Sequence, residues 1–418
     1  MNKKENILRI INYAIEESLP DVSVKEALSK MELKSNIYLL SIGKAAWRMA
    51  KAAYEILNDR VVKGIVITKY NHTEGEISSS IEIYEAGHPY PDENSLKATQ
   101  KAMEMAKRLK EKDTLLFLIS GGGSALFEYP LEGVTLEDIV NITKELMKKG
   151  ANIYELNTVR KHLSAVKGGR FAKIVSPAKI VALVLSDVLG DKLDIIASGP
   201  AYPDSTTSEE ALEVIERYNI RINPLVKKAI SIETPKSVDN AKHSIIASVK
   251  TACFAAKEMA ERLGYNTLLL STRIQGEARE VAKVFAAILK DMKESDIPIK
   301  KPAAVIAGGE TTVTVKGNGK GGRNQELALS LAIEIEGIEG ITFASVGTDG
   351  TDGPTDAAGG IVDGSTAKIL RNKGFDPKTL LENNDSYTAL KVANALLMTG
   401  PTGTNVNDII ISIVQFGG

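Results

Sequence analysis

The sequence predicts an α/β protein with two domains and mainly parallel sheets, and three observations lead to this fold class. Short apolar, β-branched runs alternate with amphipathic helical stretches along all 418 residues, as in strands joined by crossover helices. Most of these runs are continuous, which is typical of strands covered by helices on both faces. About eleven strands also fit two sheets better than one.

The predicted strands are distributed along the whole chain. In the first half of the chain we predict strands at residues 36–42, 64–68, 81–84, 114–120 and 180–185. In the second half we predict them at residues 244–247, 266–270, 303–307, 311–315, 341–346 and 409–414. The segment 311–315 differs because threonine and valine alternate in it, which favours a half-exposed, antiparallel strand.

Helical periodicity fills the intervals between the strands. The predicted helices cover residues 45–57, 94–109, 136–148, 249–263, 277–290 and 324–334. The stretch 219–242 is weakly patterned and carries Pro224 and Pro235. We therefore expect an N-terminal domain at residues 1–238 and a C-terminal domain with a mixed sheet at residues 239–418.

Composition excludes several classes of protein. The hydrophobic fraction of 43% and the charged fraction of 25% allow a sizeable core. With 52 basic and 53 acidic residues the net charge is -1, which disfavours nucleic acid as a partner. Cys253 is the single cysteine, which excludes an internal disulfide. The apolar runs are too short to cross a membrane, and no signal core opens the chain, so we expect a cytoplasmic protein.

Many of the 34 glycines gather where predicted strands end. Parallel sheets bind ligands just beyond the carboxyl ends of their strands. Gly121, Gly122 and Gly123 lie between Ser120 and Ser124, and such a run can point several N–H groups at an anion while Ser124 adds a hydroxyl donor. Gly308 and Gly309 close another strand in the same way. The alternative for each is a tight structural turn.

Two familiar motifs are absent at these turns. Leu126 stands where the nucleophile elbow of a hydrolase requires glycine. Ala45 follows Gly43 and Lys44, where a P-loop requires serine or threonine. A serine hydrolase of this type and a P-loop NTPase are therefore both excluded.

Basic side chains form a second group of candidates. Lys44 follows a buried strand and opens a helix, a good position for meeting a phosphate or a carboxylate. Asn157, Arg160 and Lys161 share one face of a helix. They either clamp an anionic substrate or decorate a surface helix, and the sequence leaves both readings open.

Carboxylates follow the other strand ends. Asp349 and Asp352 lie on a glycine-rich loop whose oxygen atoms suit Mg²⁺, and Glu310 ends a neighbouring strand. Asp187 and Asp191 follow the strand at 180–185. Solvated turn aspartates are the alternative for the glycine-rich loop.

A competing signal lies at residues 317–322, which satisfy the G-x-G-x-x-G pattern of dinucleotide-binding proteins. Read alone, it indicates an NAD-dependent reductase. The strand before it is polar, however, and Arg323 makes the start of the following helix charged instead of small and apolar. The reductase is therefore the second hypothesis.

Taken together, the segments resemble those of the glycerate kinase type-2 family. The resemblance covers essentially the whole chain, and its most specific segments are residues 321–326 (GGRNQE) and 347–357 (GTDGTDGPTDA). The family pairs an N-terminal Rossmann-like α/β domain with a C-terminal domain named MOFRL.

The resemblance implies ATP-dependent phosphorylation of D-glycerate, with Mg²⁺, in a cleft between the two domains. The usual product is 2-phosphoglycerate, with 3-phosphoglycerate as the alternative. Carried over by motif, Lys44 and Arg323 are the expected essential residues. Some members have been labelled hydroxypyruvate reductases that use NAD(P)H, which is the alternative function. A homodimer is an expectation at the level of the family.

The residues suggest a division of labour for such a transfer. Asp187 or Asp191 accepts the hydroxyl proton, while Asp349 and Asp352, with Glu310, hold Mg²⁺. The glycine loop holds either a nucleotide phosphate or the glycerate carboxylate. Spacing alone does not decide among these roles.

Overall fold

A computed structural model describes residues 3–33 and 36–416 of the chain. The chain divides into two compact units, one formed by Pro20–Ile246 and the other by Met1–Leu19 together with Ala247–Gly418. The sequence led us to expect a single crossing after residue 238. The chain instead crosses twice, because its first helix joins the C-terminal unit and a strand beyond residue 238 completes the N-terminal sheet.

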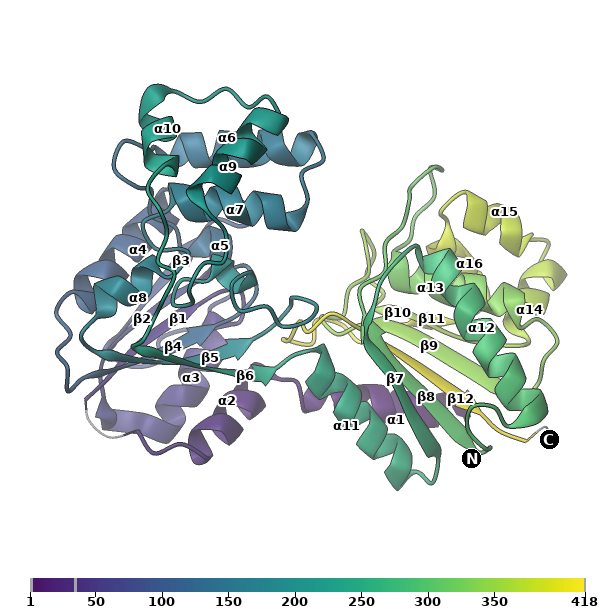
Figure 1. The fold of residues 1–418 in the computed structure, drawn as a ribbon. Helices are drawn as coiled ribbons and strands as arrows, with labels where there is room; N and C mark the ends of the chain where they lie inside the picture. The colour runs from purple at the N-terminus through teal and green to yellow at the C-terminus, as the bar shows by residue number, and fades with distance from the viewer. Residues whose placement is uncertain (1–2, 34–35, 417–418) are drawn as a thin grey trace. The chain divides into compact units, whose positions relative to one another are not determined.

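The unit Pro20–Ile246 holds one sheet and nine α-helices among its described residues (Figure 1). Its strands are β1 (Ile37–Ile42), β2 (Val61–Lys69), β3 (Ile81–Ala86), β4 (Thr114–Ile119), β5 (Lys179–Leu185) and β6 (Ala241–Ala247). Its helices are α2 (Pro20–Ser29), α3 (Ala46–Leu57), α4 (Glu93–Ala106), α5 (Gly123–Leu126), α6 (Leu136–Lys148), α7 (Ile153–Leu163), α8 (Arg170–Val175), α9 (Ser208–Arg217) and α10 (Pro224–Ile230), with short 3₁₀ turns at η1 (Asn58–Arg60) and η2 (Ile196–Ser198).

This sheet has the strand order β3-β2-β1-β4-β5-β6, and β1 to β5 pair in parallel. Helices α2 and α3 pack together on one face, and α4 and α8 lie on the other (Figure 1). The apolar side chains of β1 and β4 are buried between them, as their continuous pattern predicts. The carboxyl ends of β1, β4 and β5 therefore meet at one edge of the sheet.

Helices α6, α7, α9 and α10 form a separate layer with an apolar core of its own. Helix α7 begins after Asn152, whose side chain accepts hydrogen bonds from the N–H groups of Tyr154 and Glu155. This cap fixes the start of the helix that carries Asn157 and Arg160.

The second unit also holds one sheet. Its strands are β7 (Asn266–Ile274), β8 (Ala303–Gly309), β9 (Ile341–Gly347), β10 (Gly359–Asp363), β11 (Leu396–Leu397) and β12 (Asp408–Val414). Its helices are α1 (Lys3–Glu16), α11 (Val249–Arg262), α12 (Ala278–Ser295), α13 (Arg323–Glu334), α14 (Thr366–Asn372), α15 (Pro377–Glu382) and α16 (Ser386–Val392).

The order of this sheet is β11-β10-β9-β12-β8-β7, with β7 and β8 parallel and the other pairings antiparallel. Helices α1 and α11 cover one face, and α12 and α13 cover the other (Figure 1). The α/β class and the mixed C-terminal sheet are thus confirmed.

The strand predicted at residues 311–315 is wrong. The backbone there has one isolated bridge, from Thr312 to Glu277, and no further ladder. Instead, the Glu277 carboxylate accepts hydrogen bonds from the N–H and the hydroxyl of Thr314. Backbone groups of Gly276 and Ala278 thus bond Thr312, and the Glu277 side chain bonds Thr314. The strands β10 and β11, which we did not predict, complete the sheet.

None of the described helices is both long and apolar enough to cross a membrane.

Candidate functional site

Hydrogen bonds of Ser120 join the turn after β1 to the turn after β4. Gly43 has a φ of +112°, and a Cβ there would lie 2.2 Å from Ser120 Oγ, so only glycine fits. Ser120 Oγ donates to Ile42 O (3.1 Å) and accepts from Ala45 N (3.1 Å). The Ser120 hydroxyl is thus engaged within the protein, and it fixes the backbone that carries Lys44.

The glycine loop lets other side chains approach closely. A Cβ at Gly121 would lie 2.0 Å from Asp187 Oδ2, and a Cβ at Gly122 would lie 3.1 Å from His88 Cδ2 and 3.2 Å from Lys44 Cγ. Because the glycines leave this space, Lys44, His88 and Asp187 gather around the loop. The structure thus brings together Lys44, Asp187 and the glycine loop, as the sequence led us to expect of one sheet edge.

Charge and burial shift the protonation of two of these groups. Burial, together with the nearby charges of Lys44, Lys69 and Arg160, lowers the pKa of His88 to about 4. Burial raises the pKa of Asp187, and Lys44 opposes that rise. His88 is therefore neutral at pH 7, and Asp187 is a carboxyl group suited to exchanging a proton.

Two cations in this group have no counter-ion. Within the described residues, no carboxylate forms an ion pair with Lys44 or Arg160. Arg160 Nη2 donates only a long hydrogen bond to Ser124 O (3.4 Å), and its buried Nε has no partner. Uncompensated cations beside a glycine loop suit an anionic ligand.

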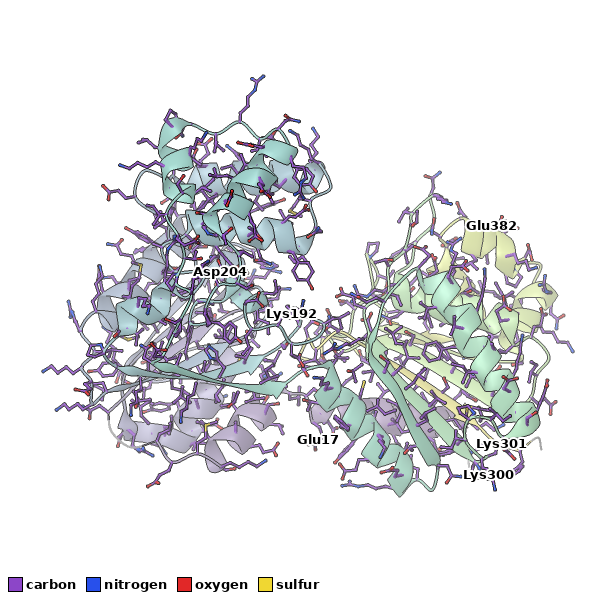
Figure 2. All side chains as sticks on the ribbon, viewed as in Figure 1. Glu17, Lys192, Asp204, Lys300, Lys301 and Glu382 are labelled. Carbon is purple, nitrogen blue, oxygen red and sulfur yellow. The ribbon has the colours of Figure 1, made fainter. Side chains whose placement is uncertain are left out.

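Lys161 plays a different part from its neighbour Arg160. Its Nζ lies 3.0 Å from Asp204 Oδ1 and 3.8 Å from Asp194 Oδ2, and the side chain is 1% exposed. Asp204, labelled in Figure 2, also accepts hydrogen bonds from Thr206 and Thr234. Since its charge is neutralised inside the protein, Lys161 is a structural residue in this conformation.

Asn157 and Asp191 complete the predicted residues of this unit. Asn157 is buried, and its Oδ1 accepts a hydrogen bond from Ser198 Oγ at 2.7 Å. Asp191 lies in a turn after β5 with a φ of +56°, where its N–H donates to Val188 O.

In the other unit, Arg323 begins helix α13 between two carboxylates. Its Nε and Nη2 donate to Asp408 Oδ2 (2.5 Å) and Oδ1 (3.0 Å), and its Nη1 lies 3.0 Å from Glu310 Oε1. Asn407 Nδ2 donates to the other oxygen of Glu310 (3.1 Å). Although burial disfavours the charge, Asp408 and Glu310 hold the pKa of Arg323 above its ordinary value.

Asp352 caps helix α13. Its two oxygens accept from Asn324 N (3.1 Å) and Gln325 N (2.9 Å), and a Cβ at Gly322 would lie 2.3 Å from its Cγ. Burial raises the pKa of Asp352 to about 6 despite these donors. This carboxylate neutralises the positive end of the helix.

The proposed Mg²⁺ ligands fit a metal poorly on their own. Asp349 Oδ1 accepts from the N–H and hydroxyl of Thr351, and Glu310 pairs with Arg323. Across residues 3–33 and 36–416, no group of three His, Cys, Asp or Glu side chains could hold a metal ion. The assignment of Mg²⁺ to Glu310, Asp349 and Asp352 stays a prediction.

The glycines at 308–309 and 317–319 allow close packing. A Cβ at Gly308 would lie 2.6 Å from Cys253 Sγ, and one at Gly309 would lie 2.0 Å from Ile274 O. In the segment 317–322, Cβ atoms at Gly317 and Gly319 would likewise lie within 2.5 Å of the backbone of Asn383. That segment follows no strand, so it lacks the context of a dinucleotide fingerprint.

Comparisons with known proteins agree along the whole chain. Residues 6–231 match the family described as "Domain of unknown function (DUF4147)", and residues 303–408 match the MOFRL family. A protein named D-glycerate 2-kinase from Thermotoga maritima is 59% identical over 411 residues, 98% of each chain. The chain belongs to the glycerate kinase type-2 family.

A solved structure and a relative with a different name also match this chain. A crystal structure of glycerate kinase from Thermotoga maritima matches with a TM-score of 0.96 at 59% identity, covering 98% of this chain and 99% of that one. A protein of Agrobacterium vitis named putative hydroxypyruvate reductase is 40% identical over 98% of this chain and 94% of its own. Both names thus occur among relatives of this family member.

Sequence reasoning missed Asp408 and Asn407. Candidate residues were expected at the carboxyl ends of strands, but Asp408 is the first residue of β12. It pairs with Gly309 and Gly347, the last residues of β8 and β9. Because β12 is antiparallel to both, its beginning lies at the edge where they end. The polar pair Asn407 and Asp408, directly before an apolar strand, was the available signal. His88 was also not among the predicted site residues, although it lies beside Gly122 of the glycine loop.

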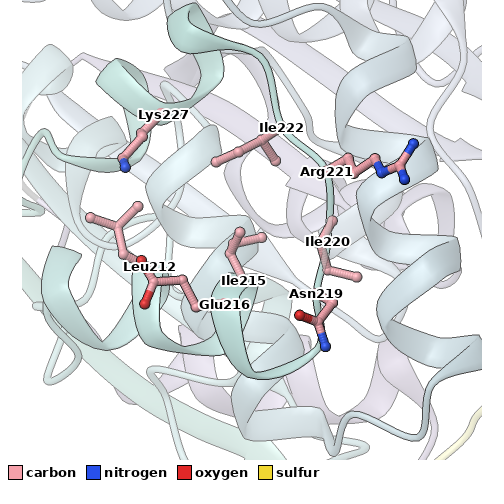
Figure 3. A pocket seen from close by; sticks show the side chains of 8 residues that line it. All are labelled: Leu212, Ile215, Glu216, Asn219, Ile220, Arg221, Ile222 and Lys227. Atoms are coloured by element: carbon pink, nitrogen blue, oxygen red, sulfur yellow. The ribbon is translucent and has the colours of Figure 1, made fainter.

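One surface pocket of this family member is formed without the glycine loop. It measures about 880 Å³ and is lined by residues of α9, α10 and the segment between them (Figure 3). Leu212 and Ile222 face it together with Lys227, whereas the glycine loop contributes no residue. We therefore do not place the chemistry there.

Proposed function

We propose that this protein phosphorylates glycerate with ATP, giving ADP and phosphoglycerate. The observation that carries the proposal is the arrangement of Lys44, Arg160 and the buried carboxyl group of Asp187 around the glycine loop, where neither cation forms an ion pair with a described residue. This arrangement suits an anionic substrate with a hydroxyl group that must lose a proton. The name of the relative from Thermotoga maritima supports glycerate as that substrate and its 2-hydroxyl as the acceptor.

In the proposed reaction, a hydroxyl oxygen of glycerate attacks the γ-phosphorus of ATP. The new O–P bond forms while the bond to the bridging oxygen of ADP breaks. Asp187 accepts the hydroxyl proton, Lys44 neutralises charge on the phosphoryl group, and Arg160 binds the glycerate carboxylate. Such a transfer needs positioning and charge neutralisation more than covalent catalysis by the protein.

Arg323, in the other unit, supplies a third cation. Its two carboxylate partners hold the guanidinium in one orientation, so little reorganisation is needed when charge develops on a phosphoryl group. We also propose that the reaction takes place in a cleft between the two domains.

Mg²⁺ enters the proposal as the cation that arrives with ATP. The phosphates of ATP are themselves Mg²⁺ ligands, and Mg²⁺ commonly keeps most of its water molecules. The described residues offer no preformed three-carboxylate site, so no step is assigned to a protein-bound metal.

One coupled assay tests the proposal. ADP release from MgATP and D-glycerate supports the kinase, whereas NADH oxidation with hydroxypyruvate and no need for ATP supports the reductase. NMR of the product then shows whether the 2- or the 3-hydroxyl carries the phosphate. If neither assay shows turnover while glycerate still binds, the proposed activity is wrong.

A further inference from the structure

Three polar side chains behind the glycine loop form a continuous chain of hydrogen bonds. Ser124 Oγ lies 2.9 Å from Ser198 Oγ, which lies 2.7 Å from Asn157 Oδ1. Asn157 Nδ2 in turn lies 3.0 Å from Ile153 O. Ser198 is 0% exposed and Asn157 2% exposed, so water does not substitute for these partners.

The direction of every bond in this chain follows from its last member. A carbonyl oxygen only accepts, so the Asn157 atom facing Ile153 O is the NH₂ group, and Asn157 Oδ1 faces Ser198. Ser198 must then donate its single proton to Asn157. The remaining bond can form only if Ser124 donates its own proton to Ser198.

This polarity reverses the role that the sequence suggested for Ser124. A hydroxyl has one proton, and here Ser198 receives it, so Ser124 Oγ can only accept from a ligand. An acceptor repels a phosphate or a carboxylate and attracts a hydroxyl group. We infer that Ser124 recognises the non-reacting hydroxyl of a hydroxy-acid substrate, with Ser198 and Asn157 as positioning residues; this inference rests on the proposed function.

Two neighbouring features agree with this assignment. The carbonyl oxygen of Ser124 accepts from Arg160 Nη2 at 3.4 Å, so one residue joins the proposed carboxylate-binding cation to the hydroxyl acceptor. A hydroxy acid carries both groups within one small molecule. Asp187 on the other side of the glycine loop remains for the reacting hydroxyl.

The backbone that presents Ser198 is strained. Ala197, Ser198 and Gly199 have φ values of +50°, +60° and +61°, a left-handed run that is unfavourable for alanine and serine. Hydrogen bonds from Gly168 N to Ser198 O (3.0 Å) and from Gly169 N to Gly199 O (2.8 Å) hold it in place. The fold therefore maintains an unfavourable conformation at the residue that orients the Ser124 hydroxyl.

The test combines enzyme variants with substrates that lack one hydroxyl. Steady-state kinetics of ADP release is measured with D-glycerate and with the deoxy analogue that keeps the reacting hydroxyl, D-lactate for transfer to the 2-position and 3-hydroxypropionate for transfer to the 3-position. We expect Ser124→Ala to lower kcat/KM for D-glycerate about fivefold to tenfold and to leave the analogue unchanged. A loss of equal size for both substrates would mean that Ser124 contacts the carboxylate or phosphate, and it would overturn the inference.

A second variant tests the positioning residues. Ser198→Ala frees the Ser124 proton, so we expect the preference for D-glycerate over the analogue to fall by about twofold to fivefold, mainly through KM. Ser231→Ala, an exposed serine on the surface of the same unit, is the matched control and should change nothing. An unchanged preference in Ser198→Ala would overturn the role of the chain.

Different results would overturn the proposed function and the inference about Ser124. Absence of ADP formation by the unmodified protein with D-glycerate overturns the proposed function, and this inference with it. Normal turnover with no difference between the two substrates in any variant overturns this inference alone.

Discussion

Arg323 and Asp408 are joined by two nearly parallel hydrogen bonds, from Nε to Oδ2 at 2.5 Å and from Nη2 to Oδ1 at 3.0 Å. The first residue of helix α13 is thereby fixed to the first residue of strand β12. Asp408 is 4% exposed, so its carboxylate depends on this partner. The pair thus combines a structural function with the proposed catalytic one.

These two functions of Arg323 can be separated. We expect Arg323→Gln to lower the free energy of unfolding by about 1–3 kcal/mol, because it leaves a buried carboxylate unpaired. We expect kcat to fall about a hundredfold or more, as for loss of a charge that stabilises the transition state. The double variant with Asp408→Asn should regain stability in a urea titration but not activity. Recovery of kcat in the double variant would show that Arg323 acts only on the fold.

Lys44 should behave differently, because it makes no ion pair within the described residues. We expect Lys44→Ala to lower the free energy of unfolding by only about 1 kcal/mol, because the side chain is half-buried but no ion pair is lost. Its kcat should nevertheless fall about a hundredfold or more. Lys51→Ala on helix α3, which follows Lys44, removes only an exposed lysine near Trp47 and is the control. Equal losses in both variants would contradict a specific role for Lys44.

Most strands and helices of the core were predictable, because continuous apolar runs are typical of strands covered on both faces and helical periodicity is typical of helices with one buried face. The glycine loop, Lys44 and Asp187 were predictable because parallel strands place their ends together. Lys161 could not be told from Arg160 by sequence, since only the fold shows that Asp204 neutralises one and not the other. The direction of the bond from Ser124 was equally inaccessible, because it depends on Ser198, far along the chain.

The role of Asp352 distinguishes a helix cap from a metal ligand. Because its oxygens accept two N–H groups of α13, we expect Asp352→Asn to lower the free energy of unfolding by about 1–2 kcal/mol. For a cap, the Mg²⁺ concentration that gives half-maximal activity should stay constant. An increase of about tenfold or more, as for loss of an ion ligand, would instead support the assignment made from the sequence.

His88 should make stability depend on pH. The unfolded chain binds a proton at this residue near the ordinary pKa of 6.5, whereas the folded protein binds it only near a pKa of about 4. Protonation between these values therefore favours unfolding, and stability contributed by neutral His88 is lost as pH falls from 6.5 to 4. We expect urea titrations at pH 7.5 and pH 5 to differ less for His88→Gln than for the unmodified protein. If the two proteins lose the same stability between pH 7.5 and pH 5, His88 does not cause this pH dependence.

Asp187 and Asp191 are the two candidate bases, and their environments favour Asp187. Its carboxylate packs against Gly121, and burial raises its pKa towards the range in which a base exchanges protons efficiently. We expect Asp187→Asn to lower kcat by about a hundredfold to ten-thousandfold, with little change in KM for glycerate. Activity of the unmodified protein should fall as pH decreases through the raised pKa, because the protonated carboxyl cannot accept the substrate proton.

The sign of the effect on stability provides an independent check on Asp187. Since its pKa is higher in the folded than in the unfolded protein, stability is greatest below the unfolded value and is lost as pH rises through the folded one. Replacement by the neutral Asn should therefore make the protein more stable at pH 8 while it removes activity, as expected where function opposes stability. Asp191→Asn should change neither the stability at pH 8 nor the activity. If Asp191→Asn abolishes turnover and Asp187→Asn does not, the base is Asp191.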